Sequence, residues 1–112
     1  MKQPEKIIEN SIMGFLKGRG VFSFKIKTVG TYDTKLGRFR KSSPWYRKGV
    51  SDILGIYRGK FLAIEVKSER GRATKEQSDF LREVHDHGGY GFIVRSIDGA
   101  KQALEIIDRE MK

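Results

Sequence analysis

The sequence predicts a single α/β domain in which a mixed β-sheet is flanked by helices. A length of 112 residues suits one domain with one modest hydrophobic core. Hydrophobic residues make up 38% of the chain and include one Trp, seven Phe and four Tyr, which is typical of a folded protein. Segments with helical spacing of apolar residues alternate with short β-forming segments in the order α-β-β-β-α-β-α. No internal repeat or linker interrupts this order, so one domain is expected to span residues 1–112.

The first half of the chain is predicted to form one helix and three strands. Pro4 suits the first helical position, the apolar residues after it recur at core-facing spacing, and Gly18 ends the helix. Strands are predicted where β-forming residues cluster, over residues 21–28, 51–57 and 60–68. Arg58 and Gly59 form a short turn between the last two strands, which indicates an antiparallel pair.

The second half is predicted to form a helix, a strand and a final helix. The first of these helices runs from about Thr74 to His85 and has an apolar inner face. A strand follows over residues 90–95, and Asp98 is expected to cap the last helix.

The composition of the chain indicates in which cellular compartment the protein is expected. The chain has no cysteine, which excludes disulfides and thiolate metal sites and fits a reducing compartment. No apolar run reaches the ~18–20 residues of a membrane span, and the amino terminus has no secretory apolar region. The expected location is therefore cytoplasmic, with no membrane partner and no small-molecule cofactor.

Two acidic residues and a lysine form the most informative pattern. In the strand predicted over residues 60–68, Glu65 and Lys67 share one face, because side chains two apart on a strand point the same way. Asp52 begins the neighbouring strand, ~4.8 Å or one diagonal step away. Two carboxylates at this spacing suit a hard cation such as Mg²⁺, with the backbone carbonyl of Val66 as a third ligand. Such an ion could support hydrolysis of a phosphodiester bond. Lys67 would then orient the water that attacks the phosphate, or neutralise the charge that develops on phosphorus. The alternative is an ordinary ion pair of Lys67 with Glu65 or Asp52.

A family resemblance favours the first interpretation. The run from Lys48 to Gly55, followed by Phe61 to Ser68, resembles the VRR-NUC family of PD-(D/E)xK nucleases, and the similarity continues over residues 71–77 and 88–96. The family implies a restriction-endonuclease-like αβββαβα core and DNA cleavage that depends on Mg²⁺ or Mn²⁺. Its stand-alone phage and bacterial members act as homodimers, related to Holliday-junction resolvases, so a branched or junction substrate is expected.

The same resemblance assigns individual roles. By position, Asp52 and Glu65 would be metal ligands and Lys67 the catalytic lysine. Ser51 stands where the family has proline, a change without effect on the chemistry.

Two further side chains are candidates for the site. Family members carry an acidic or Gln residue on the first helix, where this chain offers Glu5 and Glu9. Glu9 is favoured as a metal or water ligand because it lies at the margin of the apolar stripe, whereas the helix dipole alone accounts for Glu5. The alternative for Glu9 is a rim carboxylate paired with a lysine. Gln77 either completes a capping box with Thr74 or lies near the active site, where the family has Gln.

The positive charge predicts a nucleic-acid partner. The formal net charge is +9 at pH 7 and the pI is near 9.9, a field that favours polyanions. Residues 28–48 are predicted to form a basic loop or hairpin, with a short strand at 38–42. The side chains expected to contact DNA phosphates, without reading bases, are Arg38, Arg40, Lys41, Arg47, Lys48, Arg70, Arg72 and Lys75.

Other residues leave alternatives open. Trp45 and Tyr46 either stack on an unpaired base or cover the sheet edge. His85 and His87 are two apart on a helix and diverge, so joint metal binding is not expected. The rival functions are a non-catalytic DNA-binding module with a structural ion pair, and a toxin-like nuclease or RNase.

Overall fold

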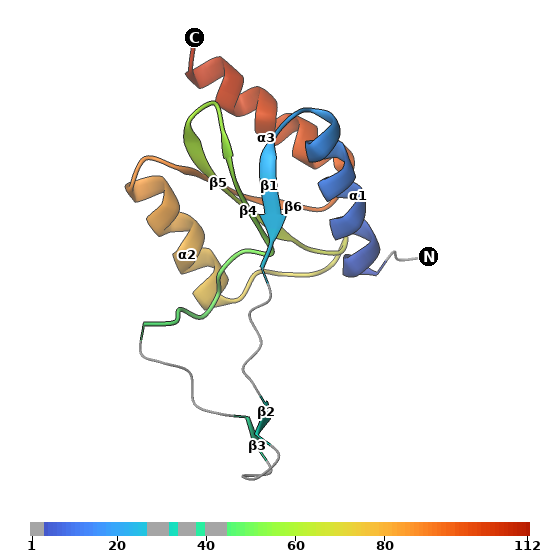
Figure 1. Cartoon of the computed structure of the whole chain (residues 1–112), viewed down its shortest axis with the longest axis vertical. Helices are drawn as coiled ribbons and strands as arrows, with labels where there is room; N and C mark the ends of the chain where they lie inside the picture. The colour runs from blue at the N-terminus through green and yellow to red at the C-terminus, as the bar shows by residue number, and fades with distance from the viewer. Residues whose placement is uncertain (1–3, 27–31, 34–37, 40–44) are drawn as a thin grey trace.

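The computed structural model describes residues 4–26, 32–33, 38–39 and 45–112, with only the backbone for 32–33 and 38–39. Its elements, in chain order, are α1 (Glu5–Gly18), β1 (Phe22–Lys25), β2 (Tyr32–Asp33), β3 (Arg38–Phe39), β4 (Ile53–Tyr57), β5 (Lys60–Val66), α2 (Lys75–Asp86), β6 (Tyr90–Val94) and α3 (Ile97–Glu110). The predicted α/β class is confirmed. The small β2–β3 pair lies between the first and second strands of the main sheet in sequence (Figure 1).

The main sheet is mixed and has the strand order β1-β4-β5-β6. The β1–β4 and β4–β5 pairs are antiparallel, whereas β5 and β6 are parallel and are connected through α2. Tyr57 pairs with Lys60 across a two-residue turn whose members, Arg58 and Gly59, have φ of 52° and 79°. Two successive left-handed residues form the turn that matches strand twist, so the predicted hairpin is confirmed.

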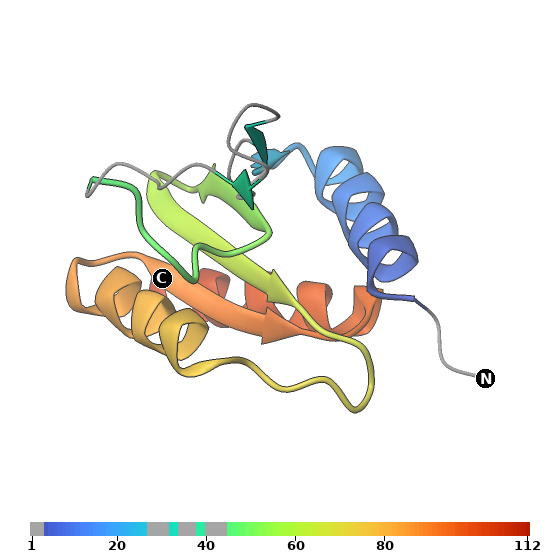
Figure 2. The same ribbon diagram turned by 90° about the horizontal axis from the view of Figure 1, so that it is seen from below.

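Helices cover both faces of the sheet. On one face, α1 and α3 contact each other and cover the larger core cluster, with Ile12, Leu16, Ile64 and Leu104 fully buried. On the other face, α2 packs against β5 and β6, and a smaller cluster forms around Ala63. Figure 2 shows α2 on the side of the domain away from α1. Glu65 follows Ala63 by two residues and therefore lies on the α2 face.

The cover over the α2 face is incomplete. Phe22, Phe24 and Ile56 point to this face from β1 and β4, beyond α2, and all three are exposed. The rings of Phe22 and Phe24 contact each other, with centroids 5.9 Å apart. The layer is thus closed over β5, the strand that carries Glu65, and over its neighbour β6, and is open over β1.

The N-cap of α2 is formed by the residue that the sequence predicts, whereas the N-cap of α3 is formed by a different residue. Thr74 caps α2 in the predicted capping box: its Oγ1 accepts from the Gln77 N–H at 3.2 Å, and Gln77 Oε1 accepts from the Thr74 N–H at 2.9 Å. The prediction that Asp98 caps α3 is wrong. Ser96 has the extended backbone of an N-cap, and its Oγ accepts from the Gly99 N–H at 3.1 Å. Asp98 lies instead in the first helical turn, where its charge faces the positive end of the helix.

Ser96→Ala is expected to lower the free energy of unfolding by about 1 kcal/mol, because the Gly99 N–H loses its acceptor. Asp98→Ala is the matched control and should cost less, about 0.5 kcal/mol, since only the dipole interaction is lost. Urea denaturation of both variants measures the difference. A larger loss for Asp98→Ala would contradict this assignment of the cap.

Within the part of the chain that the structure describes, no helix combines the length and the apolar character that crossing a bilayer requires.

Candidate active site

The candidate site lies where β4 begins and β5 ends. The register pairs Ile53 with Ile64, so Asp52 and Glu65 are the next residues on the two strands. Asp52 lies in a bend one residue before β4, although the sequence predicts it inside a strand over residues 51–57. Two hydrogen bonds hold it: its backbone oxygen accepts from the Ile26 N–H at 3.1 Å, and its Oδ2 accepts from the Val66 N–H at 2.9 Å. The bend lets the carboxylate of Asp52 bond to the backbone of the neighbouring strand β5.

Glu65 is a buried carboxylate with an unsatisfied oxygen. Its side chain is 2% exposed because α2 covers this end of β5. Its Oε2 accepts from Gln77 Nε2 at 3.3 Å and lies 3.7 Å from Lys67 Nζ. Its Oε1 has no hydrogen-bond partner among the described residues. A buried charged oxygen without a partner is costly, so this position favours either a proton or a cation.

The pKa of the Glu65 carboxyl is raised, which favours its protonated form when no cation is bound. The pKa of Glu65 is raised from 4.5 to about 8, mainly by burial and further by the neighbouring carboxyl group of Asp52. Lys67 opposes the rise by its positive charge. A pKa raised this far favours the protonated form of Glu65 at neutral pH when no cation is present.

Lys67 lies at the rim of the pair formed by Asp52 and Glu65. Its side chain is 11% exposed, and its backbone N–H donates to the Val94 carbonyl at 3.1 Å, which extends the β5–β6 pairing past the end of β5. The backbone therefore holds the lysine beside Glu65. The ion pair of the alternative interpretation is present at 3.7 Å. An ion pair alone does not explain why a second carboxylate, that of Asp52, lies against the buried one.

Gln77 fills both of the roles that the sequence left open. Its Oε1 caps the Thr74 N–H, while its Nε2 donates to Glu65 Oε2. A single amide can do both because its carbonyl and amino groups point in different directions. The start of α2 and the buried carboxylate are therefore coupled through one side chain.

Gln77→Glu separates these two roles. The new carboxylate keeps an acceptor for the Thr74 N–H, so α2 should retain its cap. It removes the donor to Glu65 and adds a like charge beside it, so any metal-dependent cleavage at neutral pH should fall by roughly 10- to 100-fold. Urea denaturation at pH 5 and cleavage rates measure the two effects. Unchanged cleavage would show that the Gln77 contact to Glu65 does not matter to the site.

Glu9 lies at the edge of the site. Its side chain is 18% exposed and pairs with Lys25 at 3.7 Å, which is the rim arrangement of the alternative interpretation. Burial raises the pKa of Glu9, the charge of Lys25 lowers it, and the charge of Asp52 raises it. The effect of Asp52 places Glu9 within the electrostatic field of the site. Glu5 is exposed in the first turn of α1, as expected for a residue that only meets the helix dipole.

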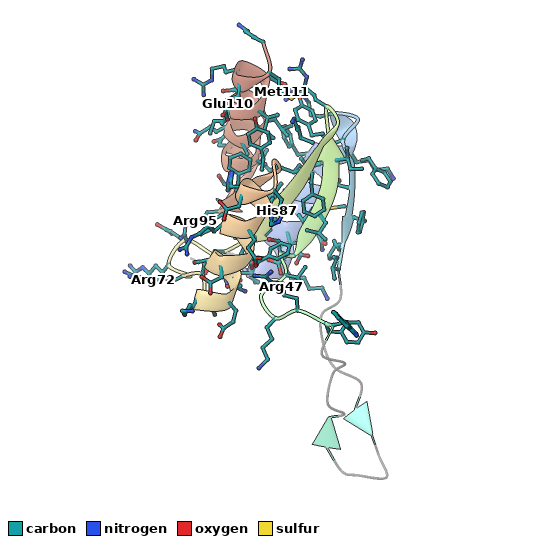
Figure 3. All side chains as sticks on the ribbon, turned by 90° about the vertical axis from the view of Figure 1, so that its left-hand side faces the viewer. Arg47, Arg72, His87, Arg95, Glu110 and Met111 are labelled. Atoms are coloured by element: carbon teal, nitrogen blue, oxygen red, sulfur yellow. The ribbon has the colours of Figure 1, made fainter. Side chains whose placement is uncertain are left out.

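The predicted DNA-contacting side chains divide into three groups. Arg40 and Lys41 lie outside the described residues, and of Arg38 only the backbone is described, in β3. Exposed side chains around the site are those of Lys48, Arg70, Arg72 and Lys75, the last paired with Asp79 at 3.2 Å. In Figure 3, Arg72 points outward from the loop before α2.

Arg47 forms the third group because its guanidinium is already engaged. It forms an ion pair with Glu83 and lies over the ring of Phe80, 5.4 Å from the centroid. Trp45 and Tyr46, just before it, are 93% and 76% exposed and thus are not packed over the sheet edge.

The histidines do not form a joint site. His85 Nε2 lies 2.9 Å from the Gly91 carbonyl oxygen, whereas His87 Nδ1 lies 2.8 Å from the Glu83 carbonyl oxygen. Each ring therefore bonds to a different backbone segment.

Three residues near the site were not predicted from the sequence. Arg95 Nη1 donates to the carbonyls of Ser68 and Gly71, both at 2.6 Å, and holds the turn that follows Lys67. Lys25 pairs with Glu9, and the buried Ser51 Oγ has no partner among the described residues. The only sequence signal for Arg95 is a charged residue at the end of a strand parallel to the one that carries Glu65.

The residues present fit a hard divalent cation. Two adjacent carboxylates with an unsatisfied buried oxygen offer the ligands that Mg²⁺ or Mn²⁺ takes from a protein, with waters and phosphate oxygens completing the shell. Among the described residues, no group of three or more His, Cys, Asp or Glu side chains could hold a metal ion. The acidic side chains that the candidate site brings together are therefore those of Asp52 and Glu65. No family model matches the sequence, and no curated protein matches it significantly.

Proposed function

We propose that this chain is a Mg²⁺-dependent deoxyribonuclease with the restriction-endonuclease-like fold of the VRR-NUC nucleases, also active with Mn²⁺. The observation that carries the proposal is the buried, half-satisfied carboxylate of Glu65 against Asp52, with Lys67 beside it. A structural role would favour apolar replacement of such a group, because an unpaired buried charge destabilises the fold. The mixed sheet, with one helix between its parallel strands, supports the proposed αβββαβα core.

Each residue has a defined part in this proposal. Asp52 and Glu65 hold the ion, and the Val66 carbonyl and Glu9 are further candidate ligands, Glu9 directly or through water. The ion supplies Lewis acidity at the scissile phosphate and acidifies the attacking water. Lys67 orients that water or stabilises the charge that develops on the phosphate oxygens. Gln77 holds Glu65 in place through its amide.

The charge of the chain supports DNA as the substrate. A net charge of +9 attracts a polyanion, and exposed basic side chains lie close in sequence to the carboxylates, Lys48 just before Asp52 and Arg70 and Arg72 just after Lys67. These contacts would hold the backbone of DNA without selecting a sequence. Preference for branched or junction DNA, cut by a homodimer, is part of the proposal on the family resemblance.

A non-catalytic DNA-binding module is the second candidate, favoured by the Lys67–Glu65 ion pair at 3.7 Å. It predicts DNA binding that weakens with salt and is indifferent to Mg²⁺. The nuclease predicts strand cleavage that requires the ion.

Cleavage of supercoiled plasmid and of a four-way junction, with and without Mg²⁺, tests the proposal. Asp52→Asn should reduce cleavage by at least about 100-fold, because one charged ligand is lost. Its amide oxygen can still accept from the Val66 N–H, so the fold should survive. Asp79→Asn, which removes a carboxylate from the surface of α2, is the matched control and should cleave normally. Equal cutting by all three proteins, or none by the wild type, would refute the proposed function.

A further inference from the structure

The two carboxylates of the candidate site come from segments that α2 contacts separately. Glu65 is held by Gln77, in the first turn of α2. Asp52 follows a segment, residues 47–51, that crosses α2 before it enters the sheet. The alignment of Asp52 with Glu65 therefore depends on how this segment is held against the helix.

Arg47 provides the first attachment. Its guanidinium pairs with the Glu83 carboxylate and lies over Phe80, and these two residues are three apart on the same face of α2. In Figure 3, Arg47 lies against α2 on the same side as His87. Both residues line a pocket of about 310 Å³ that the segment forms with α2 and the start of β5. We refer to the contacts of Arg47 with Glu83 and Phe80 as the Arg47 anchor.

Gly49 provides the second attachment. Its φ is +81°, and a Cβ placed on it would approach the Glu76 carbonyl carbon to 2.3 Å and the Gln77 nitrogen to 2.7 Å. The segment thus runs directly over the peptide that joins Glu76 to Gln77, which only glycine permits. Gln77 is the residue whose side chain holds Glu65. The backbone of residues 47–51 and the carboxylate of Glu65 therefore both contact the first turn of α2.

We infer that Arg47 is a positioning residue, which holds residues 47–51 on α2 so that Asp52 meets Glu65 in the geometry that binds the ion. The inference rests on the proposed function. After Gly49, Ser51 is fully buried and Asp52 accepts a hydrogen bond from the Val66 N–H. Packing and hydrogen bonding therefore fix the chain between the Arg47 anchor and the site. Arg47 then acts on the ion through Asp52 and not by touching DNA. This differs from the phosphate contact that the sequence alone suggests.

Charge exchange across the anchor tests the inference. Arg47→Glu and Glu83→Arg should each weaken Mn²⁺ binding in the absence of DNA by roughly 10-fold or more, measured by calorimetry. The double variant restores an ion pair with reversed polarity and should recover most of the affinity. Lys101→Glu makes the same charge change at an exposed side chain of α3, outside the proposed site, and should leave Mn²⁺ affinity within about twofold of the wild type.

The fluorescence anisotropy of Trp45 gives a second readout, which does not require metal. Trp45 is the only tryptophan of the chain and lies two residues before Arg47. Its anisotropy should fall in each single variant, as the segment gains motion, and return in the double variant. Wild-type Mn²⁺ affinity and anisotropy in Arg47→Glu, or failure of the double variant to recover either one, would overturn the inference.

The two failures can be told apart. A wild-type protein that binds no Mn²⁺ and cuts no DNA refutes the proposed function, and the positioning role for the ion falls with it. A wild-type protein that binds Mn²⁺, combined with an Arg47→Glu variant that binds it equally well and loses only DNA affinity, refutes the anchor alone and restores Arg47 as a phosphate contact.

Discussion

Replacing Glu65 with glutamine is expected to stabilise the metal-free protein at alkaline pH while it abolishes Mg²⁺-dependent cleavage. Glutamine has nearly the same shape and stays neutral at every pH, so it removes the cost of a buried charge. It also removes the ligand that the ion requires. A single substitution would then move stability and activity in opposite directions, which is the behaviour of a functional carboxylate that the fold tolerates at a cost.

The pH dependence gives the sign and the size of this effect. The pKa of Glu65 is 4.5 in the unfolded chain and about 8 in the fold, so the unfolded state releases its proton first as pH rises. The stabilising contribution of the protonated group is complete below pH 4.5 and is lost as pH rises to about 8. At about 1.4 kcal/mol per pKa unit, the loss is up to about 5 kcal/mol. Glu65→Gln should show no such loss.

Urea denaturation in EDTA at about pH 5 and pH 8.5 measures this difference. The two proteins should be similar at the lower pH, and the variant should be more stable at the higher one. Mn²⁺ should then stabilise the wild type and not Glu65→Gln, because only the charged carboxylate binds the ion. Glu69→Gln, at an exposed position four residues on, is the control. A Glu65→Gln variant that is less stable than the wild type at pH 8.5 in EDTA would favour a structural Glu65–Lys67 ion pair.

Lys67→Met is expected to reduce cleavage by roughly 10²- to 10³-fold, since it removes the positive charge 3.7 Å from Glu65 Oε2 that is proposed to act on the phosphate or the water. Methionine preserves most of the volume of the lysine stem, so the backbone bond to Val94 should persist. The fold is therefore expected to survive.

Metal binding and cleavage should respond differently in this variant. Lys67 lowers the pKa of Glu65, so its loss raises that pKa and shifts Mn²⁺ binding to higher pH. Binding should recover as the pH is raised, whereas cleavage should not. Lys60→Met, at the exposed start of the same strand, is the control and should cleave DNA normally. Recovery of cleavage together with binding would reduce Lys67 to a group that only tunes the charge of Glu65.

The elements of this fold were predictable where short-range geometry decides them. The Arg58-Gly59 turn between two β-forming segments is enough to place Asp52 opposite Glu65, because a two-residue hairpin sets the register of both strands. The Thr74 capping box was equally local. The cap of α3 was not, since Ser96 and Asp98 are both residues that favour a helix start, and only the extended backbone at Ser96 separates them.

Neighbouring residues were enough to derive the pairing of the two acids and the side of the strand on which Glu65 and Lys67 lie, because they set both the period of a strand and the length of a turn. The burial and the interaction partners of these side chains depend instead on how the helices pack against the sheet. The burial of Glu65 and its unsatisfied oxygen arise because α2 closes over β5. The engagement of Arg47 by Glu83 likewise joins residues 36 positions apart. Burial and pairing across such separations depend on which element packs where, and no local pattern encodes that.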